Sequence, residues 1–326
     1  MHCFSRRKLL IAGAAALAQS VSRAQPSGGR IYRVSIMHTA PVFNEAFLAR
    51  LQDLGYTAQK NLQVYTVVDV NTFEALAQLP AAAAEAVQRK SDLILAGGGA
   101  PVVRAIQQAA PATPLVMIFV DVDPVSAGLI DSFAHPGGNV TGIYSQNVAL
   151  AAKRLQLLKE AIPSATRIAV LFDESTRDQL EAAREAATAL QVTLVVRERR
   201  GSDYAYKDAL RSAVKEGANA LLILSSAQFF DARLQIPAIA RELRLPAIGN
   251  VLFAESGALL GYGPTFPAMF AKAAEYADRI LRGSKPAELA VDQAGLPELI
   301  VNRKTSLELG IRIPPSFEAR AHRIIS

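Results

Sequence analysis

The stretch SFAHPGGNVTG, residues 132–142, interrupts a chain that otherwise alternates short apolar runs with amphipathic helical patterns. His-Pro-Gly-Gly-Asn is typical of a turn, and the β-branched run VTGIY at residues 140–144 follows it at once. Strand-like runs precede the turn, from IYRVSIM at 31–37 to LVMIFVD at 115–121. We interpret the turn as the end of one α/β half after its fourth strand. VTGIY is then predicted to cross into a second half.

The second half repeats the pattern of the first. Its predicted strands are RIAVLFD (167–173), VTLVVRE (192–198), ALLILSS (220–226) and PAIGN (246–250). Helical patterns, one of them predicted over 229–243, separate these runs, and this alternation indicates parallel sheets with right-handed crossovers. Glycines and prolines interrupt the pattern again in GALLGYGPTFP at 257–267, which predicts a second crossing. The sequence therefore predicts an α/β protein of two Rossmann-like lobes joined by a hinge.

Composition limits the class of protein. The 326 residues are 51% hydrophobic and 20% charged, which excludes disorder and is enough for two cores. Part of the net charge of +6 comes from the first few residues. The Lys and Arg residues beyond them are scattered along helices without interleaved aromatics, so we expect no nucleic-acid partner.

The N-terminal residues have the pattern of a secretory signal. A basic Arg-Arg-Lys at 6–8 precedes the apolar run LLIAGAAALA, and small residues stand at Ser22 and Ala24. We expect a cleaved signal peptide over residues 1–24 and a periplasmic mature protein, with the Sec and twin-arginine routes both open. The single cysteine, Cys3, would be removed with the signal.

Candidate ligand-binding residues lie where predicted strands end, because ligands of open parallel sheets bind at the carboxyl ends of strands. The candidates in the first half and at the crossing are Thr39, Gly97, Gly98, Gly99, Asp121, Asp123 and Tyr144. Those in the second half are Asp173, Ser225, Phe229, Gly249 and Tyr262.

These residue types suit a small ligand with charged groups. The three glycines would let a carboxylate or phosphate approach backbone amides, and the aspartates would pair with an ammonium group, as in an amino acid. The aromatic residues would stack on an apolar portion. A structural role remains open for each: a tight glycine turn, helix capping by the polar side chains, and core or hinge packing by the aromatics.

Catalytic and metal-binding patterns are missing from the sequence. The four histidines form no H-E-x-x-H motif, and no G-x-S-x-G or carboxylate-rich metal loop occurs. We therefore expect a protein that is not an enzyme and needs no cofactor or metal.

Several longer segments resemble a known family. They are ARLQDLGYTAQKNLQV (49–64), DVDPVSAGLIDSFAHPGGNVTGI (121–143) and ELIVNRKTSLELGIRIPPS (298–316). They are similar to the substrate-binding proteins of ABC transporters, in the uncharacterised tryptophan/tyrosine-type group. The family's Asp-Pro-Val block falls on Asp123, Pro124 and Val125, and its glycine turn on residues 97–99; His135 departs from the family's usual Arg or Lys.

The resemblance implies a type I periplasmic binding fold with a three-crossover hinge. It places lobe one in residues 30–143 plus 263–288, and lobe two in 144–262 plus 289–326. It further implies a monomer that captures a small solute and delivers it to an ABC permease in the inner membrane, which works with a cytoplasmic ATPase. The solute would be an amino acid or a small aromatic or carboxylate compound. The alternatives are a sensory periplasmic binding protein that engages a membrane receptor, an exported enzyme, and a repressor's effector domain.

Overall fold

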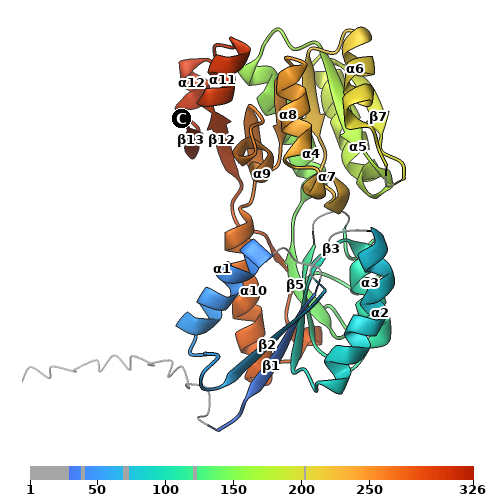
Figure 1. Cartoon of the computed structure of the whole chain (residues 1–326), viewed down its shortest axis with the longest axis vertical. Coiled ribbons are helices and arrows are strands. Elements are labelled where there is room, and N and C mark those ends of the chain that lie inside the picture. Colours follow the sequence, from blue (N-terminus) through green and yellow to red (C-terminus); the bar gives the residue numbers. More distant parts are fainter. Residues whose placement is uncertain (1–28, 38–40, 69–72, 120–122, 202) are drawn as a thin grey trace, which may run out of the picture.

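The computed structural model describes residues 29–37, 41–68, 73–119, 123–201 and 203–326. Two α/β lobes lie one above the other along the long axis of the molecule, and the chain passes between them near the middle (Figure 1). No helix within these ranges is long and apolar enough to cross a membrane. The predicted signal peptide, residues 1–24, lies outside them.

Lobe one contains a six-stranded sheet in the order β11-β5-β4-β3-β1-β2, in which every pairing is parallel. Its strands are β1 (Tyr32–Met37), β2 (Leu62–Val68), β3 (Leu93–Gly98), β4 (Leu115–Phe119), β5 (Val140–Tyr144) and β11 (Asp292–Gln293). Helices cover both faces (Figure 1): α1 and α10 pack on one through Phe47 and Ala273, and α2 and α3 on the other through Ala83 and Val103. Both faces are covered, so the central strands read as continuous apolar runs.

Lobe two contains a seven-stranded sheet in the order β13-β12-β10-β9-β8-β6-β7. Its strands are β6 (Arg167–Phe172), β7 (Thr193–Glu198), β8 (Ala220–Ile223), β9 (Ala247–Gly249), β10 (Leu260–Gly263), β12 (Glu298–Asn302) and β13 (Arg323–Ile325). All pairings are parallel except that of β10 with β12. This pair is antiparallel because β10 ends at the hinge, where the chain leaves lobe two, and β12 begins at the hinge, where the chain returns.

The helices follow the strands in the alternating order that the sequence predicts. They are α1 (Pro41–Asp53), α2 (Phe73–Gln88), α3 (Ala100–Ala109), α4 (Asn147–Ala161), α5 (Arg177–Ala189), α6 (Tyr206–Lys215), α7 (Ala227–Asp231), α8 (Gln235–Glu242), α9 (Val251–Glu255), α10 (Phe266–Leu281), α11 (Arg303–Leu309) and α12 (Pro315–Glu318), with 3₁₀ turns at Glu174–Thr176 and Pro286–Glu288. The single helix predicted over 229–243 is instead the pair α7 and α8. Pro237 fits this break, because a proline lacks the N–H that an interior helical residue donates, and α8 places it in its first turn, where no such donor is needed.

The chain crosses between the lobes three times: after β5, after β10 and after β11. The predicted α/β fold of two Rossmann-like lobes with a three-crossover hinge is therefore confirmed. The first crossing differs in detail from the prediction, because VTGIY is β5 itself and pairs with β4, Val140 opposite Leu115. The chain leaves lobe one only at residues 145–146. Similarly, β11 pairs with β5, so residues 292–293 belong to the first sheet rather than to lobe two.

Gly142 is required where β5 passes close to β4. Its φ is +141°, and a Cβ built there would lie 2.1 Å from the carbonyl oxygen of Met117. Any side chain at this position would clash with the neighbouring strand's backbone. The glycine in VTGIY therefore serves the packing of lobe one, immediately before the hinge.

Candidate ligand-binding cleft

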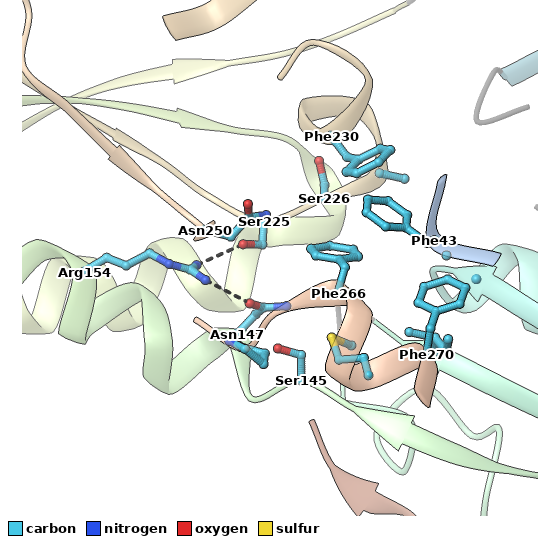
Figure 2. Close-up of a pocket in the computed structure, with 16 residues that line it drawn as sticks. Phe43, Ser145, Asn147, Arg154, Ser225, Ser226, Phe230, Asn250, Phe266 and Phe270 are labelled. Carbon is cyan, nitrogen blue, oxygen red and sulfur yellow. Dashed lines mark hydrogen bonds between the residues drawn. The ribbon is translucent and has the colours of Figure 1, made fainter. Parts of the chain in front are cut away.

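A cavity lies between the lobes, beside the first two crossings (Figure 2). Lobe one contributes mostly apolar residues from the ends of its strands and from two helices, and lobe two contributes mostly polar ones. The lining consists of Phe43, Gly97, Gly98, Ile118, Phe266, Met269 and Phe270 from lobe one, Asn147, Arg154, Ser225, Ser226, Ala227, Phe230 and Asn250 from lobe two, and Ser145 and Pro264 from the crossings.

Four phenylalanines form the apolar side of the cavity. The Phe43 ring, on α1, stacks on Phe266 with centroids 4.8 Å apart and lies 5.6 Å from Phe270, both on α10. Phe230, on α7 of lobe two, reaches across to them, with its ring 5.6 Å from Phe43 and 5.8 Å from Phe266. The phenylalanine cluster (Phe43, Phe230, Phe266, Phe270) is therefore an apolar contact between the two lobes as well as a wall of the cavity (Figure 2).

Arg154 lies at the opposite, polar side, and its side chain has no exposed surface. From the second turn of α4, its Nε donates to the carbonyl oxygen of Tyr262 at 2.8 Å, and one Nη donates to Ser225 Oγ at 2.9 Å. The other Nη approaches Asn147 Oδ1 at 3.4 Å. These partners are all neutral, and no carboxylate among the described residues pairs with the guanidinium. Burial without a counter-charge lowers the pKa of Arg154 to about 9.

The polar groups of this wall are oriented as hydrogen-bond donors. The Ser225 Oγ accepts from Arg154, which leaves its O–H to donate. The Asn250 Oδ1 accepts from the N–H of Leu252 at 3.1 Å and caps α9, so the remaining polar group of that side chain is its amide nitrogen. Ser226 already donates to the Asp173 carboxylate and accepts from the N–H of Phe229. A carboxylate oxygen, which only accepts, is the complementary ligand group.

Three of the predicted site residues, Gly97, Gly98 and Ser225, line this cavity. Thr39 and Asp121 lie outside the described residues.

Other predicted site residues stand next to the lining in sequence. Gly99 is the N-cap residue of α3, and Gly249 ends β9 directly before Asn250. Tyr262 contributes its carbonyl oxygen, which holds Arg154.

The remaining four predicted residues make contacts within the protein. Asp123 Oδ1 accepts from the N–H of Val125 at 2.7 Å, and the Asp173 carboxylate accepts from two serine hydroxyls. Tyr144 packs on Phe133 with centroids 5.2 Å apart, and Phe229 is fully buried in the core of lobe two. None of these four side chains lines the cavity. They occupy the capping and packing roles that the sequence analysis left open, and ligand contact by them stays a prediction.

The sequence analysis missed Arg154 and the phenylalanine cluster. A signal for Arg154 exists, because it interrupts the apolar stripe of α4 formed by Ala151, Leu155 and Leu158, where an arginine has to be buried. The phenylalanines carry no comparable signal, since rings near helix ends are common in any core. No group of three or more His, Cys, Asp or Glu in the described part of the chain is arranged to hold a metal ion.

The family model for ABC transporter substrate binding proteins matches residues 41–325, which is most of the chain. The chain belongs to this family. This confirms the resemblance found in the sequence.

Among curated proteins, the chain is 27% identical over 271 residues to a protein of Clostridioides difficile named "Tyrosine-binding protein", covering 80% of this chain and 74% of that one. Two solved structures share the fold. One, a conserved domain protein from Vibrio cholerae, matches with a TM-score of 0.80 and 23% identity, over 90% of this chain and 100% of that one. The other, an ABC domain from Streptococcus pneumoniae in complex with L-Trp, matches with a TM-score of 0.78 and 18% identity, again over 90% and 100%.

Proposed function

We propose that this protein is the exported solute-binding protein of an ABC importer, which captures a small solute between its lobes and delivers it to a membrane permease. The observation that carries this proposal is the cavity between the lobes, with an apolar wall from lobe one and a donor-rich wall from lobe two. The solute is an amino acid or a small aromatic or carboxylate compound. The names of the relatives favour this class, since one is called tyrosine-binding and another holds L-Trp.

Capture works by closing the lobes. A solute that touches both walls makes all of its contacts only when the lobes are together, so it shifts the population toward the closed form. The permease, together with its cytoplasmic ATPase, then recognises that form. Binding and release need no bond to be made or broken, so we infer a protein without catalytic activity and without a cofactor.

Export places the protein where such a capture is useful. The signal-like N-terminus supports cleavage after Ala24 and a periplasmic mature chain that begins at Gln25. Detection of that N-terminus on protein recovered from the periplasmic fraction is the expected outcome. Retention of the full-length chain in the cytoplasm would contradict this part of the proposal.

The function is tested by a thermal-shift screen of the mature chain against amino acids, aromatic acids, sugars and nucleosides. A ligand at 100 times its Kd stabilises the folded state by about 2.7 kcal/mol, which raises Tm by a few degrees. We expect hits among amino acids or aromatic acids, together with a smaller radius of gyration by X-ray scattering as the lobes close. Hits confined to sugars or nucleosides, or turnover of a bound compound, would overturn the proposal.

A further inference from the structure

We propose that the cleft selects an aryl carboxylate, a compound with an aromatic ring and one carboxylate but no ammonium group, over the corresponding amino acid. The carboxylate binds to the wall formed by Arg154, Ser225 and Asn250, and the ring binds to the phenylalanine cluster. This inference rests on the proposed function, and it chooses between the two classes of solute named there.

The charge of the cavity favours a monoanion. Among the described residues that line it, Arg154 is the only ionisable one, so this lining carries one positive charge. A buried guanidinium without a counter-charge is unfavourable, and a bound monoanion would neutralise it. A zwitterionic amino acid brings an ammonium along with its carboxylate, so the described lining would keep its net positive charge when the amino acid is bound.

The hydrogen bonds on the lobe-two wall leave donors free for a ligand. Arg154 fixes Ser225 Oγ as an acceptor, and the N–H of Leu252 fixes Asn250 Oδ1 as an acceptor, so both side chains have donors left for a ligand. The Asp173 carboxylate, which is an obvious partner for an ammonium, accepts from Ser175 and Ser226 and does not line the cavity. This wall therefore matches a carboxylate, which only accepts hydrogen bonds. Its described lining offers no acidic side chain to an ammonium group, which only donates them.

The two sides of the cavity differ in polarity. Arg154, Ser225 and Asn250 lie together at one side of the cavity, and the rings of Phe43, Phe230 and Phe266 lie at the other (Figure 2). The first residue of the 15-residue helix α4, Asn147, also lines the polar side, which adds the positive end of a helix dipole there. A ligand with an anionic end and an aromatic end fits this polarity, and its ring completes the contact among the phenylalanines.

The test compares three ligands that differ only in their charged groups: 3-phenylpropanoate, L-phenylalanine and 2-phenylethylamine. Isothermal titration with the wild-type mature chain at neutral pH measures all three, after refolding from denaturant to remove any solute carried over from the host. We expect 3-phenylpropanoate to bind at least tenfold more tightly than phenylalanine, and no binding of phenylethylamine. Ser225→Ala, which removes one donor but no charge, should weaken 3-phenylpropanoate binding several-fold, with a circular dichroism spectrum like that of the wild type.

Failure of this inference is distinguishable from failure of the proposed function. Tighter binding of phenylalanine, or measurable binding of phenylethylamine, would overturn the selection for an aryl carboxylate while leaving the protein a solute-binding protein. Absence of binding by all three ligands, with hits among other amino acids in the screen, would also overturn it. Hits confined to sugars or nucleosides would overturn both.

Discussion

The two walls of the cleft are built in opposite ways. The lobe-one wall consists of Phe43, Phe266, Phe270 and their apolar neighbours, which belong to the hydrophobic core that holds α1 and α10 on the first sheet. The lobe-two wall is organised by Arg154, a fully buried cation held by neutral partners. One wall is an extension of a core, and the other is a polar network in which no described carboxylate pairs with the arginine.

This difference assigns separate tasks to the lobes. The apolar wall is stable without ligand, because its phenylalanine rings pack on one another. It suits any flat apolar group. The polar wall holds a buried positive charge that no described carboxylate neutralises, and under our proposal it contributes most of the discrimination among solutes. Each prediction below changes one lobe or the contact between the two lobes.

The largest expected effect follows from Arg154→Met. This change removes the positive charge of the polar wall and keeps an unbranched side chain on α4. Removing one partner of a buried, hydrogen-bonded charge pair weakens the free energy of binding by roughly 2–5 kcal/mol. The affinity for 3-phenylpropanoate should therefore fall by about 100-fold or more. Stability should change much less, because removing an uncompensated buried charge offsets the lost hydrogen bonds.

A neighbouring residue on the same helix provides the matched control. Lys153 is half-buried and lies outside the cavity lining, so Lys153→Met removes one positive charge without touching the polar wall. Isothermal titration should show nearly unchanged affinity for this variant. Equal affinities for the two variants would mean that the charge of Arg154 does not contribute to binding.

Gly142→Ala tests lobe one by itself. The added Cβ would meet the Met117 carbonyl oxygen at 2.1 Å, and φ is +141°, so β5 has to move away from β4. Overpacking and backbone strain together should lower the free energy of unfolding by about 2–4 kcal/mol. Gly138→Ala is the control, since the nearest atom to its Cβ is the side-chain nitrogen of Gln107 at 3.8 Å.

Hydrogen exchange resolved by segment locates the effect of Gly142→Ala. We expect faster exchange in β4 and β5, whereas β6 and β8 of the second sheet should keep their protection. Equal loss of protection in both sheets would mean that the lobes do not unfold separately, and would remove the basis for treating them as two regions.

The sequence predicted the fold well because the fold depends on local and periodic signals. Apolar runs such as DLILAGG at 92–98, separated by amphipathic helices, are sufficient to indicate two parallel sheets. The errors concern which lobe a strand belongs to, because that depends on which strand it pairs with. VTGIY belongs to lobe one because it pairs with β4, and β11, with only two residues, belongs there because it pairs with β5. Neither fact has a signal in the local sequence.

The candidate site was predicted less well, for a related reason. Ligands of parallel sheets bind at strand ends, and this rule correctly predicted that Gly97, Gly98 and Ser225 lie at the cleft. It could not distinguish Phe229, which points into the core, from Phe230, which reaches the other lobe. Arg154 lies within a helix and not at a strand end, so its position in the cleft follows only from the packing of α4 beneath Ser225 and Tyr262.

Phe230→Ala should produce a moderate effect that is confined to the contact between the lobes. Phe230 comes from lobe two but contacts the rings of Phe43 and Phe266 in lobe one, so its removal weakens the closed form. Aromatic pairs contribute about 0.5–1.5 kcal/mol each, so even the lower figure for both pairs, about 1 kcal/mol, predicts an affinity loss of about fivefold or more. Phe230→Leu should recover part of the loss, and an unchanged affinity in Phe230→Ala would show that the apolar wall functions without lobe two.

The smallest expected effect concerns Glu160, in the last turn of the helix that carries Arg154. Its carboxylate accepts from Arg320 at 2.5 Å, and this hydrogen bond lowers the pKa of Glu160 against the opposing effect of partial burial. A pKa below that of the unfolded chain means that the pair stabilises the protein above about pH 4.3, and that the stabilisation disappears as the pH falls through the folded-state value.

Glu160→Gln should therefore cost about 0.5 kcal/mol or less at pH 7, since solvent screens a pair whose arginine is 53% exposed. Urea denaturation of the two proteins should give converging stabilities at acid pH. A difference that persists there would mean that Glu160 acts through packing and not through its charge. The expected outcome separates two charges on α4. The half-buried Glu160 carboxylate pairs with Arg320 and affects stability slightly, whereas the buried Arg154 guanidinium has only neutral partners among the described residues and affects binding strongly.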